Sequence, residues 1–289
     1  MTIKVVNIGD LQLEVCTKGE VGPVVVIETG MGCSFYEWDM IATIISKKAK
    51  VIMYHREGYG NSTILQEPCT SSRIVENLRL LLEKEKIKQP VILVGHSFGG
   101  LCVQHFAALY PHNVLGVVLV DSSPRQMYKI EELKRQLSTI QNIYPTHKTL
   151  ERMNRFSNMS EEEILEQVNA KELIIKEFLS KPNLYKANAS ELENMFDSGR
   201  EIEALDIFPN IPLKVMVRDR EVAENSLIKA GIDEKEARIF EDLIQELSRD
   251  SVGYSTKGKL IPVKNSGHCI YIDCPSNVIH AIEEVISEI

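Results

Sequence analysis

The residue types that could do chemistry gather first around Ser97, the centre of a Gly-His-Ser-Phe-Gly segment (95–99). The apolar run 91–94 predicts a buried strand, and the apolar spacing of 100–110 predicts a helix that ends before Pro111. A turn this tight needs glycines beside its central residue, whose backbone we expect to be strained. The hydroxyl would lie at a helix N-terminus, where unpaired amides stabilise negative charge. This arrangement is suited to nucleophilic attack on a carbonyl.

A serine nucleophile needs a base that takes its proton at neutral pH, and histidine has the side chain with the nearest unperturbed pKa. His268 is the best-placed histidine, because the predicted strand 260–263 and the turn 264–267 would carry it to the sheet edge that holds Ser97. Histidines inside predicted helices are expected to pack or to face solvent. We therefore expect His268 to be the base.

The acid that orients the histidine has two possible positions. Asp121 directly follows the predicted strand 114–120, in a Leu-Val-Asp-Ser-Ser ending. Asp219 and Glu221 follow the later strand 214–217. The two arginines that flank Asp219 also make it a candidate for a surface ion pair without a catalytic role. The residues alone leave both positions open.

The elements that must position these side chains alternate between strands and helices. Short apolar runs predict strands at 3–8 and 11–16, around a Gly-Asp hairpin turn, and at 24–27, 51–54, 91–94, 114–120, 214–217 and 260–263. Helical spacing predicts helices at 35–47, at 71–87 with a serine N-cap, at 100–110 and at 276–288. This order predicts an α/β fold with a mostly parallel sheet of about eight strands, covered by helices on both faces.

A long segment in the middle of the chain departs from this alternation. Residues 124–206 read as charged, methionine-bearing helical stretches, which we interpret as an inserted helical cap between core segments 1–123 and 207–289. An insertion at this point would lie over the carboxyl ends of the strands, where open α/β sheets bind their ligands. A further helical stretch is predicted at 221–247.

Four motifs resemble those of the α/β-hydrolase fold, and they follow one another along the chain at 28–32, 54–62, 95–100 and 265–268. Gly-His-Ser-Phe-Gly-Gly (95–100) resembles its nucleophile site, and Asn-Ser-Gly-His (265–268) resembles its late histidine loop. The segment 54–62 is similar to the family's Asp-Arg-x-Gly-x-Gly-x-Ser turn, with His55 where aspartate is usual. Glu-Thr-Gly-Met-Gly (28–32) takes the place of the usual His-Gly oxyanion loop, keeping the glycines but not the histidine.

The resemblance runs along nearly the whole chain apart from the cap, and it implies the serine-nucleophile, esterase- or lipase-like branch of the fold. Ser97 would be the nucleophile and His268 the base, with the oxyanion hole made by the backbone amides of Met31 and Phe98. Most relatives carry the acid after the seventh strand. The ending at Asp121 resembles a subgroup in which that strand carries no clear acid, which favours Asp121.

The activity that this resemblance implies is acyl transfer to water. An ester of a small apolar acyl group would be cleaved through an acyl-enzyme, without a metal or an organic cofactor. Serine at the elbow counts against epoxide hydrolases and haloalkane dehalogenases, whose nucleophile is a carboxylate. Aminopeptidase-like and carbon–carbon bond hydrolases look similar, and a ligand-binding or signalling relative with little turnover is an alternative of another class.

Composition indicates which partners and which cellular compartment to expect. The 289 residues carry a net charge of −8, and lysine and arginine are spread along the chain, which argues against a nucleic-acid partner. The sequence begins without a signal-peptide pattern and contains no apolar run of membrane-spanning length. The six cysteines show neither zinc-like spacing nor the density of a disulfide scaffold. We expect a cytoplasmic protein with reduced thiols that binds a small molecule.

Overall fold

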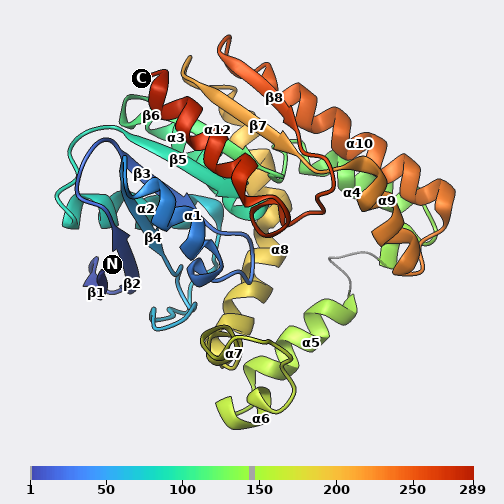
Figure 1. The fold of residues 1–289 in the computed structure, drawn as a ribbon. Coiled ribbons are helices and arrows are strands. Elements are labelled where there is room, and N and C mark those ends of the chain that lie inside the picture. Colours follow the sequence, from blue (N-terminus) through green and yellow to red (C-terminus); the bar gives the residue numbers. More distant parts are fainter. Residues whose placement is uncertain (1, 143–146) are drawn as a thin grey trace.

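The sheet is the central feature of the computed structural model, which describes residues 2–142 and 147–289. The described residues contain one sheet of eight strands in the order β1-β2-β4-β3-β5-β6-β7-β8 (Figure 1). The strands are β1 (Thr2–Asn7), β2 (Gln12–Lys18), β3 (Val24–Glu28), β4 (Lys50–Tyr54), β5 (Val91–His96), β6 (Val114–Val120), β7 (Leu213–Val217) and β8 (Gly258–Pro262). Each predicted strand is thus present, within a few residues of its expected bounds.

The sheet contains both antiparallel and parallel strand pairs. β1 and β2 form the predicted antiparallel hairpin, and β2 is also antiparallel to β4. The pairs from β4 through β3, β5, β6 and β7 to β8 are all parallel. Every residue of β3 and of β5 is buried, as expected for strands covered on both faces. The mostly parallel sheet is therefore confirmed.

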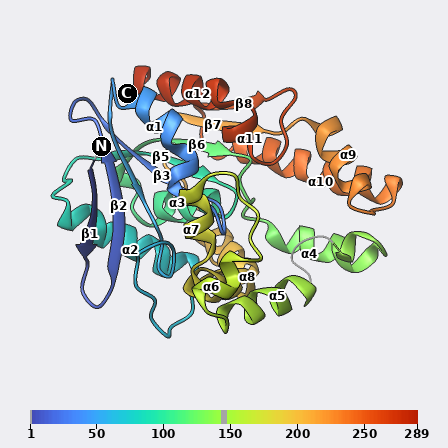
Figure 2. The ribbon, with the colours of Figure 1, turned by 60° about the horizontal axis from the view of Figure 1, so that its bottom comes forward.

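Helices cover both faces of this sheet (Figure 2). On one face, α1 (Asp39–Ile45) and α12 (Pro275–Ser287) share an apolar cluster with the strands. On the other face, α2 (Ser71–Lys84) and α3 (Phe98–Leu109) share a second cluster with them. These two layers hold the strand ends, and therefore the loops that follow them, in fixed positions.

Between β6 and β7 the described chain forms a series of helices. They are α4 (Met127–Gln136), α5 (His147–Ser157), α6 (Glu161–Leu165), α7 (Leu173–Leu179) and α8 (Pro182–Leu205). In Figure 1, α5, α6 and α7 lie together at one end of the molecule, and α8 runs from this group to the sheet. A division of the chain into core and cap at 124 and 206 stays a prediction.

Two predicted helices differ from those observed. The stretch 35–47 is a 3-10 helix, η1 (Phe35–Trp38), that continues as α1. The stretch 221–247 is two helices, α9 (Arg220–Lys229) and α10 (Glu234–Val252). They are separated at Gly231, whose φ of 91° is incompatible with a continuous helix, and Asp233 caps the second. The remaining short helices are η2 (Pro111–Asn113), η3 (Ile140–Asn142) and α11 (Ile270–Asp273).

The predicted serine cap of α2 is also wrong, because the cap is Thr70. Its side chain accepts a hydrogen bond from the amide of Arg73 at 3.3 Å. Ser71 is already the first helical residue, and its hydroxyl lies 2.8 Å from Nδ1 of His105 instead. The helix ends at Lys84, three residues before the predicted end at Ile87.

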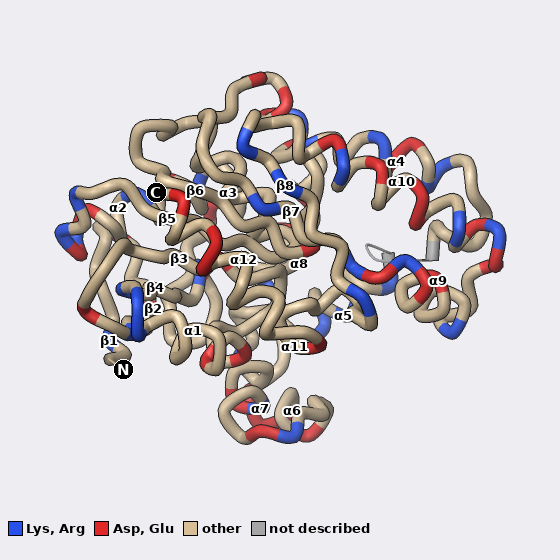
Figure 3. Tube along the Cα trace, turned by 45° about the horizontal axis from the view of Figure 1, so that its top comes forward, with Lys and Arg blue, Asp and Glu red and all other residues tan. Residues whose placement is uncertain are grey.

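Charged residues of both signs are interspersed over the molecule (Figure 3). Among the described residues, no helix has both the length and the apolar character needed to cross a lipid bilayer. The six cysteines all lie in the described part of the chain and are free thiols.

Candidate active site

Ser97 occupies the turn between β5 and α3, with φ 52° and ψ −124°. A positive φ is uncommon for a residue with a side chain and indicates backbone strain. A Cβ on Gly95 would lie 2.6 Å from the Cα of Gly100. A Cβ on Gly99 would collide with the carbonyl oxygen of Thr29. The close approach of these backbones explains why the turn needs glycine on both sides of the serine.

Three strand ends bring the predicted nucleophile, base and acid together. Oγ of Ser97 lies 3.0 Å from Nε2 of His268, and Nδ1 of the same ring lies 2.6 Å from Oδ2 of Asp121. The serine follows β5, the aspartate follows β6 and the histidine follows β8. The side chain of His268 is 47% exposed, whereas that of Asp121 is 2% exposed. This geometry allows the ring to take the serine proton while a buried carboxylate holds the ring in place.

The two other acid candidates make different contacts. Asp219 caps α9 by accepting from the amide of Glu221 at 3.1 Å, and it also accepts from the amide of Asn265 at 3.0 Å. Glu221 is exposed in the first turn of that helix. The candidate ion pair between Asp219 and its flanking arginines is replaced by one with Lys264, whose Nζ lies 3.8 Å from Oδ2 of Asp219.

Arg218 pairs with Asp121 instead. Its Nη1 donates to Oδ2 of Asp121 at 3.0 Å, and its backbone amide donates to Oδ1 at 3.3 Å. Its Nη2 donates to Oε2 of the buried Glu241 at 2.6 Å. Burial alone would raise the pKa of Asp121, but Arg218 and the hydrogen bond from His268 outweigh it and hold that pKa below its usual range. The carboxylate therefore stays ionised at neutral pH.

His96 supports the loop that carries His268. Its Nε2 donates to the backbone carbonyl of His268 at 3.1 Å. Burial, followed by the nearby charge of His268, lowers the pKa of His96 to about 3, so its ring is neutral at neutral pH. In that bond Nε2 must carry the proton, because the carbonyl can only accept.

The two predicted oxyanion residues come from segments that pack on each other. Phe98 is the first residue of α3, and Met31 lies in the loop after β3. The tight contact between Gly99 and Thr29 joins the helix N-terminus to this loop. Phe98 is buried in an apolar cluster against which the partly buried side chain of Met31 packs. The structure thus places the two segments side by side.

Several buried residues around the site were missed by sequence reasoning. Arg56 and Glu191 form an ion pair beside the loop after β3, and Glu241 holds Arg218. The one available signal was the arginine of the Asp-Arg-x-Gly-like turn. A glutamate within a predicted helix is expected to lie on the solvent-exposed face. The sequence therefore did not distinguish Glu191 or Glu241 from a surface residue.

Comparison with known proteins agrees with this architecture. Residues 22–142 match the family described as alpha/beta hydrolase fold. Protein YqjL of Bacillus subtilis is 28% identical over 130 residues, which are 42% of this chain and 51% of that protein. A pimeloyl-[acyl-carrier protein] methyl ester esterase of Pseudoalteromonas atlantica is 30% identical over 105 residues, or 36% of this chain and 39% of that enzyme. The chain thus spans about half, or less, of the length of these curated relatives.

Solved structures extend the likeness over the whole fold. The enol-lactonase of Burkholderia xenovorans superposes with a TM-score of 0.66 and 14% identity, covering 99% of this chain and 100% of that structure. At this identity the likeness concerns the fold alone. Taken with the family match over residues 22–142 and the order of the eight described strands, it shows that this chain has the α/β-hydrolase fold.

Proposed function

We propose that this chain is a serine hydrolase that cleaves an ester-type bond through an acyl-enzyme. The observation that carries the proposal is the hydrogen-bonded series Ser97, His268 and Asp121, with separations of 3.0 Å and 2.6 Å. Histidine between a serine hydroxyl and a buried carboxylate is the arrangement that makes a serine nucleophilic at neutral pH. The strained backbone of Ser97 and its place at a helix N-terminus support the same role.

In the proposed reaction, His268 takes the proton of Ser97 as Oγ attacks the carbonyl carbon. The amides of Phe98 and Met31 stabilise the tetrahedral oxyanion, and Asp121 stabilises the imidazolium. Collapse of the intermediate transfers the ring proton to the leaving alcohol and leaves the acyl group on Ser97. Water, deprotonated by the same ring, then releases the acid and restores the serine.

The apolar surroundings of the oxyanion segments favour a small apolar acyl group. Phe98 and Leu101 share a cluster with Met127 and Leu192 from the helices between β6 and β7, and Met31 packs against it. A charged acyl group would lose its hydration among these apolar side chains. The similar proteins include one named as a methyl ester esterase and one named as an enol-lactonase.

The test is hydrolysis of a p-nitrophenyl ester series, from acetate to long chains, by the wild-type protein and by Ser97→Ala. Turnover that disappears in Ser97→Ala supports the proposal, and the chain-length preference then measures the acyl site. Equal rates for both proteins would reject a serine esterase. The assay also separates an enzyme from a ligand-binding relative with little turnover, since the latter would bind esters without hydrolysing them.

A further inference from the structure

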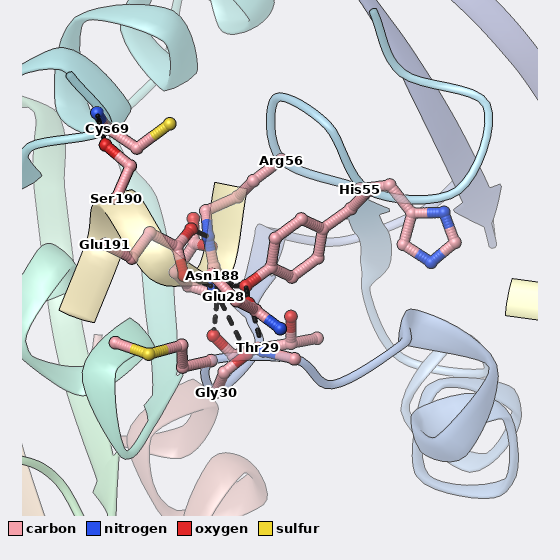
Figure 4. Close-up of polar contacts among 12 residues, drawn as sticks. Glu28, Thr29, Gly30, His55, Arg56, Cys69, Asn188, Ser190 and Glu191 are labelled. Atoms are coloured by element: carbon pink, nitrogen blue, oxygen red, sulfur yellow. Dashed lines mark hydrogen bonds and ion pairs between the residues drawn. The ribbon is translucent and has the colours of Figure 1, made fainter. Parts of the chain in front are cut away.

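A buried polar cluster joins helix α8 to the loop that carries Met31 (Figure 4). Arg56 and Tyr59 contribute to it from the segment after β4, and Asn188 and Glu191 contribute from α8. The side chains of Arg56 and Glu191 are each 1% exposed. Buried charges are retained in proteins only with close partners, so the contacts of this cluster are strong structural constraints.

Arg56 holds the last residue of β3 and the first two residues of the loop that follows. Its Nη1 donates to Oε1 of Glu28 at 2.8 Å and to the carbonyl oxygen of Thr29 at 2.7 Å. Its Nη2 donates to the carbonyl oxygen of Gly30 at 3.2 Å. One planar guanidinium therefore sets the positions of the peptide units immediately before Met31.

Tyr59 holds the other side of the same loop. Its hydroxyl oxygen accepts from the amide of Gly32 at 2.8 Å and from Nη2 of Arg56 at 3.0 Å. The same oxygen lies 2.6 Å from Oε2 of Glu191 and also contacts Oδ1 of Asn188. The tyrosine proton is thus directed to α8, while the oxygen accepts from the loop and from Arg56.

Glu191 fixes both of these side chains. Its Oε1 accepts from Nε of Arg56 at 2.7 Å, and its Oε2 accepts from Nη2 at 3.1 Å. A two-point contact of this kind sets the plane of the guanidinium as well as its position. Helix α8 is itself anchored to the rest of the chain, because Ser190 Oγ accepts from the amide of Cys69 at 2.9 Å and Ser198 Oγ accepts from the amide of Ser71 at 3.1 Å.

We propose that Glu191 is a positioning residue for the oxyanion loop, acting through Arg56 and Tyr59. The inference rests on the proposed function, since it assumes that the amide of Met31 stabilises an oxyanion. Oxyanion donors act only when they are aimed at the position that the charged oxygen will occupy. A residue of the segment inserted between β6 and β7 thereby controls a catalytic distance in the loop after β3.

Arg56 also reaches the second predicted donor segment. Its guanidinium carbon lies 5.7 Å from the centre of the Phe98 ring. Rotation of the guanidinium would therefore disturb the loop after β3 and the first residue of α3 together. This double contact predicts an effect on the rate of the chemical step rather than on substrate binding.

The test compares Glu191→Gln with Glu193→Gln, a matched control on the exposed face of the same helix. Three quantities are measured on each protein: hydrogen exchange at the Gly32 amide, and kcat and KM for the best p-nitrophenyl ester. In Glu191→Gln we expect exchange at Gly32 to rise about tenfold and kcat to fall about 10- to 100-fold, with KM changed less than about threefold. Glu193→Gln should match the wild-type protein in all three.

Tyr59→Phe is a second variant, which keeps the ring and removes the acceptor of the Gly32 amide. It should reproduce the kcat loss with KM retained. If Glu191 acts through Tyr59 and Arg56, the losses in Glu191→Gln and Tyr59→Phe should combine to less than their product in the double variant. Losses that multiply fully would overturn the proposed route of action.

The exchange measurement separates this inference from the proposed function. Wild-type exchange at Gly32 in Glu191→Gln would overturn the positioning role, whether or not the protein hydrolyses esters. Faster exchange with an unchanged kcat would overturn its catalytic consequence. If wild type and Ser97→Ala hydrolyse the ester series equally, the esterase proposal fails and with it the catalytic part of the inference, while the Gly32 amide still reports whether Glu191 holds the loop.

Discussion

Two regions of this molecule carry a serine, a histidine and a carboxylate in the same hydrogen-bonded order. At the carboxyl edge of the sheet, His268 lies 3.0 Å from Ser97 and 2.6 Å from Asp121. On the other side of β3, Nε2 of His55 lies 2.9 Å from Oγ of Ser34, and its Nδ1 lies 2.7 Å from Oε2 of Glu14. The distances are nearly equal, so distances alone do not make a site.

Access and backbone geometry distinguish the two regions. The side chain of His268 is 47% exposed, whereas Ser34 is fully buried and His55 is 1% exposed. Ser34 Oγ accepts from the amide of Tyr36 as the cap of η1. The ring of His55 stacks on that of Phe35, with 3.9 Å between the ring centroids. The buried series therefore ties β2, β4 and η1 together. A reactive site also needs an open nucleophile and donors for the developing charge.

Substitution of the histidine in each region should give the largest difference in ester turnover between the two regions. We expect His268→Gln to lower kcat/KM for esters about 10⁵-fold, because the serine loses its base. His55→Gln should retain turnover within a few-fold while losing about 2 kcal/mol in the free energy of unfolding, since buried partners are left unpaired. Ester hydrolysis and urea unfolding of both variants check this. Loss of turnover in a folded His55→Gln protein would contradict a structural role for that series.

Substitution of the two candidate acids, Asp121 and Glu221, should also have unequal effects on kcat, and the larger of them should be smaller than the effect of His268→Gln. Asp121→Asn should lower kcat about 10⁴-fold, because an amide no longer holds the required tautomer or stabilises the imidazolium. Glu221→Gln should change kcat by less than about twofold, since Glu221 lies exposed in α9 and does not pair with the ring. Kinetics on folded protein, verified by circular dichroism, decide between them. The reverse ranking would move the acid to the loop after β7.

Glu241 contacts Arg218, which in turn contacts Asp121, so its substitution should lower kcat less than substitution of Asp121 does. Glu241→Gln leaves Arg218 with Asp121 as its charged partner and should lower kcat about tenfold by altering the position of the carboxylate. The exposed Glu246→Gln on the same helix is the matched control. A wild-type kcat in Glu241→Gln would show that Arg218 positions Asp121 without help from α10.

The smallest effect concerns acid stability. Burial lowers the pKa of His55 below its usual value of 6.5. Above about pH 6.5 His55 is neutral in both the folded and the unfolded chain. Below that pH the unfolded chain takes up a proton that the folded protein excludes. The free energy of unfolding therefore falls as the pH falls, by up to about 1.4 kcal/mol per pH unit. His55→Gln should therefore flatten the decline in Tm between pH 7 and pH 5. An unchanged slope would assign the decline to other groups, such as His96.

Local patterns account for what could be predicted. The runs that became β3, β5 and β6 are apolar because both faces of those strands are covered, and that composition is visible without a structure. The glycines around Ser97 likewise report a backbone need that is local to the turn. Predictions were wrong where a local signal was ambiguous. The helical spacing of 221–247 predicts one helix, whereas the structure has two, separated at Gly231.

The remaining features depend on contacts between residues far apart in the chain. Asp121 and Asp219 both follow strands, and only packing brings one of them to His268 and directs the other to cap α9. Arg56 and Glu191 are 135 positions apart, so their pairing has no sequence pattern.

The sequence by itself determined the order of strands and helices, the turn at Ser97 and the prediction that His268 is the base. Burial and tight turns restrict the residue types at neighbouring positions, so these features are visible in a short stretch of sequence. The tertiary structure decided which carboxylate meets the histidine, which residues of α8 contact the loop after β3, and which of the two serine–histidine–carboxylate series is exposed. Those outcomes depend on burial and on distances across the folded chain, which spacing along the sequence does not encode.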